Sequence, residues 1–214
     1  MHSEDSAEGR GREVQKTVQE KIEDYEYSPE HLPTKVGWFD ITLPPTCIER
    51  LWQYVNDPAT KNYPAIQSLA GNISKSYYLE DVNQWFMKNY LEFMCYDYVN
   101  IYDHNFYGEL GERNFNKHPL HLDSFWVNYQ YENVFNPMHC HAGIFSFVVF
   151  MKIPTHWQDQ HRTKASHNSN IPCAGDFSFT YLDALGTHKI EPMRMSPERD
   201  GTCLLYTSPS PRDS

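Results

Sequence analysis

The sequence predicts an α+β fold in which helices of the first half pack against a rolled antiparallel sheet. Apolar residues recur at helical spacing up to about residue 102, and they alternate with a period of two from residue 118 onward. The chain has 214 residues, which suits a single domain with a substantial core. Helices first and strands afterwards is the order typical of an α+β protein, and the strands suffice for a rolled sheet.

The first hundred residues contain an arm, one strand and two helices. Residues 1–34 are polar and acidic and predict a flexible arm, in which only residues 14–22 carry a helical apolar face. Residues 37–43 alternate as an edge strand does. Two prolines end that strand, and the second suits the first turn of a helix that runs to Tyr54. A longer helix over residues 79–102 has a wide aromatic stripe and is expected to pack on the sheet.

Four strands are expected in the second half, at residues 125–131, 144–153, 176–182 and 189–195. Residues 155–172 are rich in His, Gln, Asn and Ser and are expected to form an exposed loop. The expected domain therefore spans residues 35–202.

Composition excludes several classes of function. The formal net charge is −10, and no run of Lys and Arg is present, which argues against nucleic acid and anionic membranes as partners. No apolar run reaches the roughly 20 residues that cross a bilayer, and no signal peptide is evident. Five cysteines without a C-x-x-C motif fit a reduced, cytoplasmic chain. Glu80 and Asp81 are expected to be solvated charges on the long helix.

The last twelve residues differ in character from the rest. Residues 203–213 match, letter for letter, one reading frame of a transposon-end adapter used in sequencing libraries. We therefore expect residues 203–214 to be a non-native tail that forms no closing strand, and the native sequence to stop near Thr202. The chain would then be a fragment with an open sheet edge, and it is expected to be aggregation-prone or only partly folded.

His139 and His141 stand just before the apolar residues 144–153. Residues two apart on an extended segment point to the same side, so the two imidazoles share one face and Cys140 faces the other. A non-haem iron site needs ligands on one side and open positions opposite. The strand that follows is apolar on both faces and hence buried, which puts the pair inside the roll. His139 and His141 are the predicted metal ligands.

A competing pair lies earlier in the chain. His121 and Asp123 form a His-x-Asp, the more usual first half of a site with two histidines and one carboxylate. They precede the strand expected at residues 125–131, so they also sit at a strand entry. The alternative interpretation is a loop histidine beside a turn-forming aspartate. Neither a G-x-S-x-G nucleophile motif nor a Gly-rich phosphate loop is present.

A run of motifs matches a known pattern: W-V-N at 126–128, N-x-x-H-x-H at 136–141, S-F-V-V-F at 146–150 and I-P at 153–154. The segments G-D-F-S-F at 175–179 and L-A-G-N-I at 69–73 extend it. Over residues 36–202 the chain resembles a family of 2-oxoglutarate- and iron(II)-dependent oxygenases common in bacteria and in marine phages of the T4-like type.

The resemblance implies a double-stranded β-helix, or jelly-roll, with Fe(II) on His139 and His141 and with 2-oxoglutarate as co-substrate. Asn128 would help to hold the co-substrate. The family's distal His and its 2-oxoglutarate-binding Arg follow a strand that begins like Gly201-Thr202, so we expect both to be missing here and this fragment to be inactive. The substrate, a small molecule or a protein side chain, is open. A cupin-type metalloprotein that does not use 2-oxoglutarate and a non-catalytic binding module are the alternatives.

Overall fold

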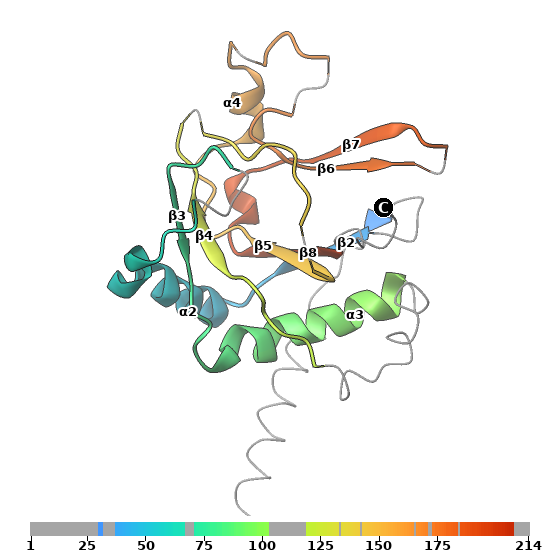
Figure 1. The fold of residues 1–214 in the computed structure, drawn as a ribbon. Coiled ribbons are helices and arrows are strands. Elements are labelled where there is room, and N and C mark those ends of the chain that lie inside the picture. The colour runs from blue at the N-terminus through green and yellow to red at the C-terminus, as the bar shows by residue number, and fades with distance from the viewer. Residues whose placement is uncertain are drawn as a thin grey trace, which may run out of the picture.

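The computed structural model describes residues 30–31, 37–66, 71–102, 119–132, 134–141, 143–164, 166–170, 173–183 and 185–207. Helices and antiparallel sheets are mixed in these ranges, and the described strands close no barrel (Figure 1). The α+β prediction is confirmed at this level. The expected helix over residues 14–22 lies outside the described residues, whereas Glu30–His31 of the expected arm form the short strand β1.

The central sheet has four antiparallel strands in the order β1, β2 (Gly37–Thr42), β8 (Thr202–Thr207) and β5 (Phe145–Val149). We expected the strand at residues 37–43 to lie at an edge, and that expectation is wrong. It lies between β1 and β8, because the strand that covers its other side comes from the far end of the chain. Leu205 of β8 pairs with Phe39 on one side and with Phe147 on the other.

Strand β8 also overturns the expectation that residues 203–214 form no closing strand. Residues 203–207 complete the middle of the central sheet, and every residue of β8 is buried, Leu204 completely. The sequence Cys-Leu-Leu-Tyr is apolar on both alternating faces, which is what a strand between two layers requires. The structure does not bear on whether residues 203–213 are encoded by an adapter, so their adapter origin stays a prediction.

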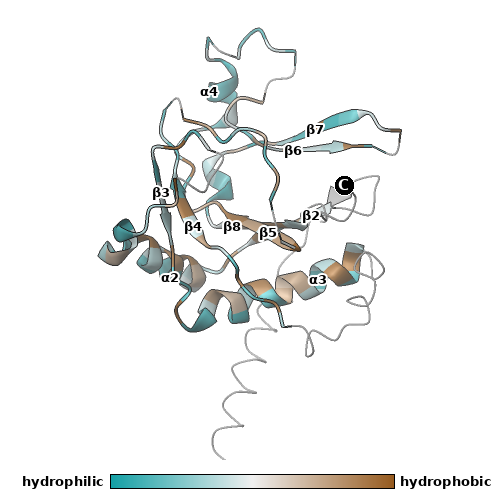
Figure 2. Ribbon diagram, in the orientation of Figure 1, coloured by the Kyte–Doolittle hydropathy of each residue, from teal (hydrophilic) through white to brown (hydrophobic). Residues whose placement is uncertain are grey.

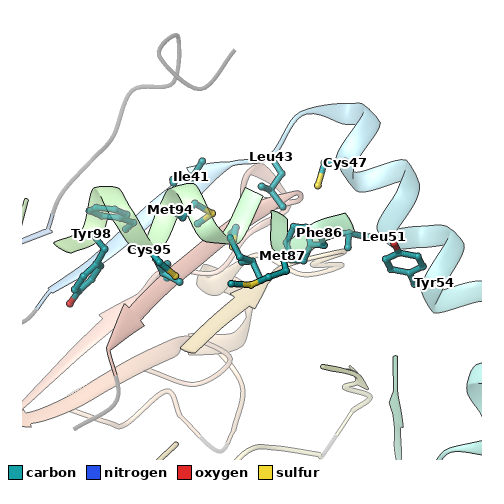
Figure 3. Packing of buried hydrophobic residues seen from close by; sticks show 14 of the residues in the cluster. Ile41, Leu43, Cys47, Leu51, Tyr54, Phe86, Met87, Met94, Cys95 and Tyr98 are labelled. Carbon is teal, nitrogen blue, oxygen red and sulfur yellow. The ribbon is translucent and has the colours of Figure 1, made fainter. Parts of the chain in front are cut away.

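One face of the sheet is covered by helices. Helix α2 (Pro45–Asn56) begins at Pro45 and runs two residues past Tyr54, close to the prediction. Helix α3 (Glu92–Tyr102) packs on β2 and β8, as expected of the aromatic stripe. Figure 3 shows the main hydrophobic core, which lies between the helices and the sheet. Its buried residues include Phe39, Ile41, Leu51, Phe86, Leu91, Met94, Tyr98 and Leu205. In Figure 2 much of α3 and β5 is brown, whereas α4 is mostly teal.

The helix predicted over residues 79–102 starts later than expected. A short 3-10 helix, Val82–Gln84, and a π-helical turn, Met87–Leu91, precede α3, and Asn83 and Gln84 have positive φ angles of 59° and 55°. Asp81 is not a solvated charge on a helix. Its two carboxylate oxygens accept the backbone N–H groups of Phe86 at 2.8 Å and Met87 at 2.9 Å, so it caps the helical segment.

The opposite face of the sheet is covered by a hairpin of β6 (Phe177–Leu182) and β7 (His188–Met193). Together the two layers enclose a second cluster of buried apolar residues, namely Trp38, Met193, Met195, Leu204 and Tyr206. Phe177 and Phe179 of β6 pack against it. The central sheet is thus sandwiched between α3 and this hairpin (Figure 1).

The remaining described elements are one pair of strands, one α-helix and two 3-10 helices near the ends of other elements. Strands β3 (Lys75–Tyr78) and β4 (Trp126–Tyr129) form a separate antiparallel pair, and a 3-10 helix, Pro58–Asn62, follows α2. Helix α4 (Trp157–His161) lies inside residues 155–172, where only a loop was expected. A final 3-10 turn, Pro197–Arg199, leads into β8. The four strands expected in the second half exist, although β5 ends at Val149 rather than at residue 153.

Candidate metal centre

The imidazoles of His139 and His141 lie side by side. Their ring centroids are 4.7 Å apart, with an angle of 41° between the planes. The alternation argument predicted this proximity, and it is confirmed, although residues 138–141 form a loop rather than a strand. The expectation that the pair lies inside the roll is wrong for His139, which is exposed, because the loop leaves the sheet before β5 begins. The ring of His141 also contacts Tyr206, with centroids 5.9 Å apart, and Tyr206 belongs to the cluster between the sheet and the hairpin. The pair therefore lies on the hairpin side of the central sheet.

His139 is held by its own loop. Its Nδ1 lies 2.7 Å from the carbonyl oxygen of Pro137. A carbonyl only accepts hydrogen bonds, so Nδ1 carries the proton and donates it. The Nε2 atom of His139 then has a lone pair, which the exposed position of the ring makes available to a metal ion.

His141 is half-buried, and its environment favours the neutral ring. Burial lowers its pKa below the ordinary value of 6.5, and the neighbouring His139 lowers it further. A metal ion binds the neutral imidazole, so the lowered pKa makes His141 available as a ligand at lower pH. The hydroxyl of Tyr206 lies 3.5 Å from Nε2 of His141. A hydrogen bond of this length is weak, so it competes little with a metal ion for this nitrogen.

The pair supplies two nitrogen ligands on one side. This matches part of the ligand set of a non-haem iron centre. Within the described ranges, no group of three or more His, Cys, Asp and Glu side chains is placed to hold a metal ion. The two ligands leave several coordination positions for co-substrate, oxygen or a further ligand.

The competing pair has a different environment. His121 and Asp123 are both exposed, while Leu122 between them packs against the main core, so the two polar side chains share the outer side of the segment. Residues 119–125 form no strand, and Asp123 accepts a hydrogen bond of 3.1 Å from the hydroxyl of Ser124. Both pairs therefore lie on segments without regular structure, but the rings of His139 and His141 contact Pro137 and Tyr206, which orient them.

Asn128 is tied to β3 rather than to the histidines. Its side-chain oxygen accepts a hydrogen bond of 2.6 Å from the hydroxyl of Ser76, which is itself buried. That contact fixes the amide and leaves its NH2 group to bind something else. A role for Asn128 in holding a co-substrate stays a prediction.

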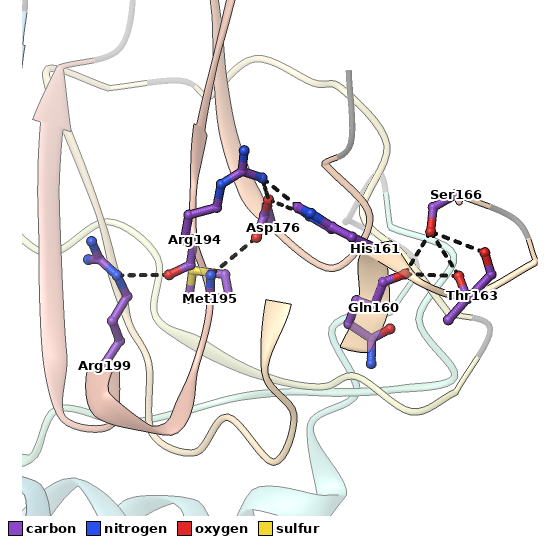
Figure 4. A network of polar contacts seen from close by, with 8 residues as sticks. All are labelled: Gln160, His161, Thr163, Ser166, Asp176, Arg194, Met195 and Arg199. Atoms are coloured by element: carbon purple, nitrogen blue, oxygen red, sulfur yellow. Dashed lines mark hydrogen bonds and ion pairs between the residues drawn. The ribbon is translucent and has the colours of Figure 1, made fainter. Parts of the chain in front are cut away.

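A polar network that the sequence did not reveal lies at the base of the hairpin (Figure 4). The completely buried carboxylate of Asp176 accepts hydrogen bonds of 2.7 Å from Arg194 and 3.0 Å from His161, and one of 3.1 Å from the backbone N–H of Met195. The guanidinium of Arg194 also lies over the ring of Trp157, 5.0 Å from its centroid. The network fastens α4 to the hairpin. Its members are widely separated in sequence, so no spacing motif announces it.

One buried donor in the layer beneath the hairpin has no protein acceptor among the described residues. The indole Nε1 of Trp38 is enclosed in the second cluster, with the ring stacked on Phe179 at 4.6 Å. A buried donor without a partner costs about 1–3 kcal/mol. An acceptor from water or a ligand would remove that cost.

Searches of family models, of curated proteins and of solved structures each found no match to this chain. None of the helices in the described ranges has the length and apolar character needed to cross a bilayer.

Proposed function

We propose that this chain carries the metal-binding half of a 2-oxoglutarate- and Fe(II)-dependent dioxygenase, a cytoplasmic hydroxylase of jelly-roll fold. The observation that carries the proposal is the pair of imidazoles, 4.7 Å apart at the entry to β5. Two imidazole nitrogen donors on one side are part of what the protein contributes to such a site. The motifs around residues 126–154 support the same class.

The surroundings of the two histidines differ. His141 is half-buried and its ring contacts Tyr206 in the layer between the central sheet and the β6–β7 hairpin, a layer lined with aromatic rings, whereas His139 is exposed. On the His141 side, an apolar lining would strengthen electrostatic contacts with a bound substrate. The indole N–H of Trp38 in the same layer, which has no acceptor among the described residues, would offer a hydrogen bond to a polar group of a ligand.

In this proposal each histidine has a distinct task. Nε2 of His139 binds Fe(II), while the Pro137 carbonyl fixes the orientation of the ring. His141 supplies the second nitrogen, and its lowered pKa keeps it unprotonated. When bound, iron and 2-oxoglutarate supply the oxidising chemistry, and the chain's residues hold and orient the reactants. Asn128 is proposed to donate to the co-substrate.

The proposal is tested by succinate formation from 2-oxoglutarate. We expect a version of the chain that is extended by strands carrying a distal His and an Arg to form succinate with Fe(II). His139→Ala and His141→Ala should abolish this, and Leu185→Ala, at a remote and 90% exposed position, should not.

The 214-residue chain itself is expected to form no succinate. Turnover by this chain that needs iron but not His139 or His141 would contradict the assignment of the site. Iron binding by the extended version without any use of 2-oxoglutarate would favour a cupin-type metalloprotein, and absence of metal binding would favour a binding module.

A further inference from the structure

The loop that carries the two histidines is fastened to a segment from much earlier in the chain. The backbone N–H of Asn72 donates a hydrogen bond of 2.9 Å to the carbonyl oxygen of Phe135, and the two residues form an antiparallel bridge. A few residues further on, β3 pairs with β4 through Lys75 and Tyr129. The chain between β4 and the histidine loop is therefore held at both ends by residues 72–78.

Gly71 lies where the loop comes closest to this segment. A Cβ at position 71 would come closer than van der Waals contact to Oδ1 of Asn136, and it would lie 2.9 and 3.0 Å from Cδ1 and Cγ1 of Ile73. The φ of Gly71 is not positive, so the reason for a glycine here is space rather than backbone conformation. Ile73 is 6% exposed and packed in the interior, whereas Asn136 lies at the surface. A larger residue at position 71 would therefore displace Asn136.

A displacement of Asn136 reaches the carbonyl group that orients His139. Proline fixes its own φ at about −65° and restricts the residue before it to extended conformations. Asn136-Pro137 is therefore a stiff unit with few ways to absorb a shift. The carbonyl oxygen of Pro137 accepts the hydrogen bond of 2.7 Å from Nδ1 of His139, so a movement of this unit moves the acceptor.

We propose that Gly71 is a positioning residue of the metal centre. Its lack of a side chain lets Asn136 lie against the segment before β3, and this places the Pro137 carbonyl at Nδ1 of His139. The inference rests on the proposed function, because it concerns the orientation of a proposed iron ligand. The hydrogen bond of the ring decides which nitrogen carries the proton. Loss of the carbonyl would let the proton move to Nε2, where it would compete with the metal ion.

The inference is tested in the metal-free 214-residue chain by proton–nitrogen correlation NMR of the imidazole rings, at a pH where the rings are neutral. The chemical shifts of the two ring nitrogens report which of them carries the proton. We expect the proton of His139 on Nδ1 in the unsubstituted chain and a redistribution toward Nε2 in Gly71→Ala. The Fe(II) affinity of Gly71→Ala should fall at least about tenfold, as for loss of a group that orients a metal ligand.

Gly186→Ala is the matched control. Gly186 has a φ of 74°, and an added Cβ would meet no atom within 4 Å. This substitution strains the backbone at the hairpin, so it reports the general cost of replacing a glycine. It should leave the proton of His139 on Nδ1.

Asn136→Ala tests whether the effect passes through the side chain that lies against Gly71. Alone, it should leave the proton of His139 on Nδ1. Combined with Gly71→Ala it restores the space, so the proton should return to Nδ1, and any loss of folded structure seen for Gly71→Ala by far-UV circular dichroism should be recovered as well. No redistribution in Gly71→Ala, or no recovery in the double variant, would overturn the inference. Because the ring nitrogens are observed without iron, a failure of every variant to bind Fe(II) would count against the proposed function alone.

Discussion

His139 and His141 lie with their ring centroids 4.7 Å apart, and burial of His141, together with this proximity, lowers the pKa of His141. The folded pKa lies below the ordinary value of 6.5, so the unfolded chain binds a proton more readily. The contribution of His141 to stability is therefore present above pH 6.5 and lost as the pH falls through the folded pKa.

The pKa of His141 should rise in His139→Gln yet stay below 6.5, because burial is the larger cause and remains. An NMR titration of the ring protons measures it, with His167→Gln, at an exposed position, as the control. A pKa of His141 that is unchanged in His139→Gln would show that the two rings do not interact as their spacing implies.

Asp176→Asn should destabilise the fold by about 2–4 kcal/mol, because Arg194 and His161 would lose a buried carboxylate acceptor. Urea unfolding followed by tryptophan fluorescence measures the change. Asp159→Asn is the control, since Asp159 is 68% exposed and its contact with Arg162 is a long 3.9 Å. Equal effects of the two substitutions would contradict the anchoring role of Asp176.

Asp81→Ala should cost about 1–2 kcal/mol, because two backbone N–H groups at the start of the helical segment lose their acceptor. Glu80→Ala removes a neighbouring exposed carboxylate and should change the free energy of unfolding little. If Glu80 mattered as much as Asp81, general charge effects rather than capping would be responsible.

Leu205→Ala should cost about 2–5 kcal/mol, since Leu205 is 1% exposed and pairs with Phe39 and Phe147 in the central sheet. Leu185→Ala, at a 90% exposed position, is the control. Hydrogen exchange gives an independent reading, because the amides of Leu204 and Leu205 should be protected. Rapid exchange at both amides would support the original expectation that residues from Cys203 onward form no strand of the sheet.

The sequence predicted those features that depend on local patterning. Alternation located β5, β6 and β7, and the Pro44-Pro45 step located the start of α2. The same alternation placed His139 beside His141. Each of these features is determined by residues within a few positions of one another.

Features that depend on distant partners were not predictable in this way. Whether β2 lies at an edge depends on β8, more than 160 residues later, and the composition of residues 203–214 suggested a tail instead. The capping role of Asp81 depends on the positive φ angles of Asn83 and Gln84. These angles could not be predicted from the residue types alone. The network of Asp176 with His161 and Arg194 joins α4 to the hairpin and follows no sequence period.

The central claim, that His139 and His141 bind the metal, is tested most directly by anaerobic calorimetric titration of Fe(II) into the 214-residue chain. The account predicts one bound Fe(II) per chain, with affinity reduced at least about tenfold by His139→Ala or His141→Ala. His121→Ala with Asp123→Asn should leave Fe(II) binding unchanged. Iron binding that survives both single histidine variants but is lost with His121 and Asp123 would contradict the account and move the metal centre to the earlier pair.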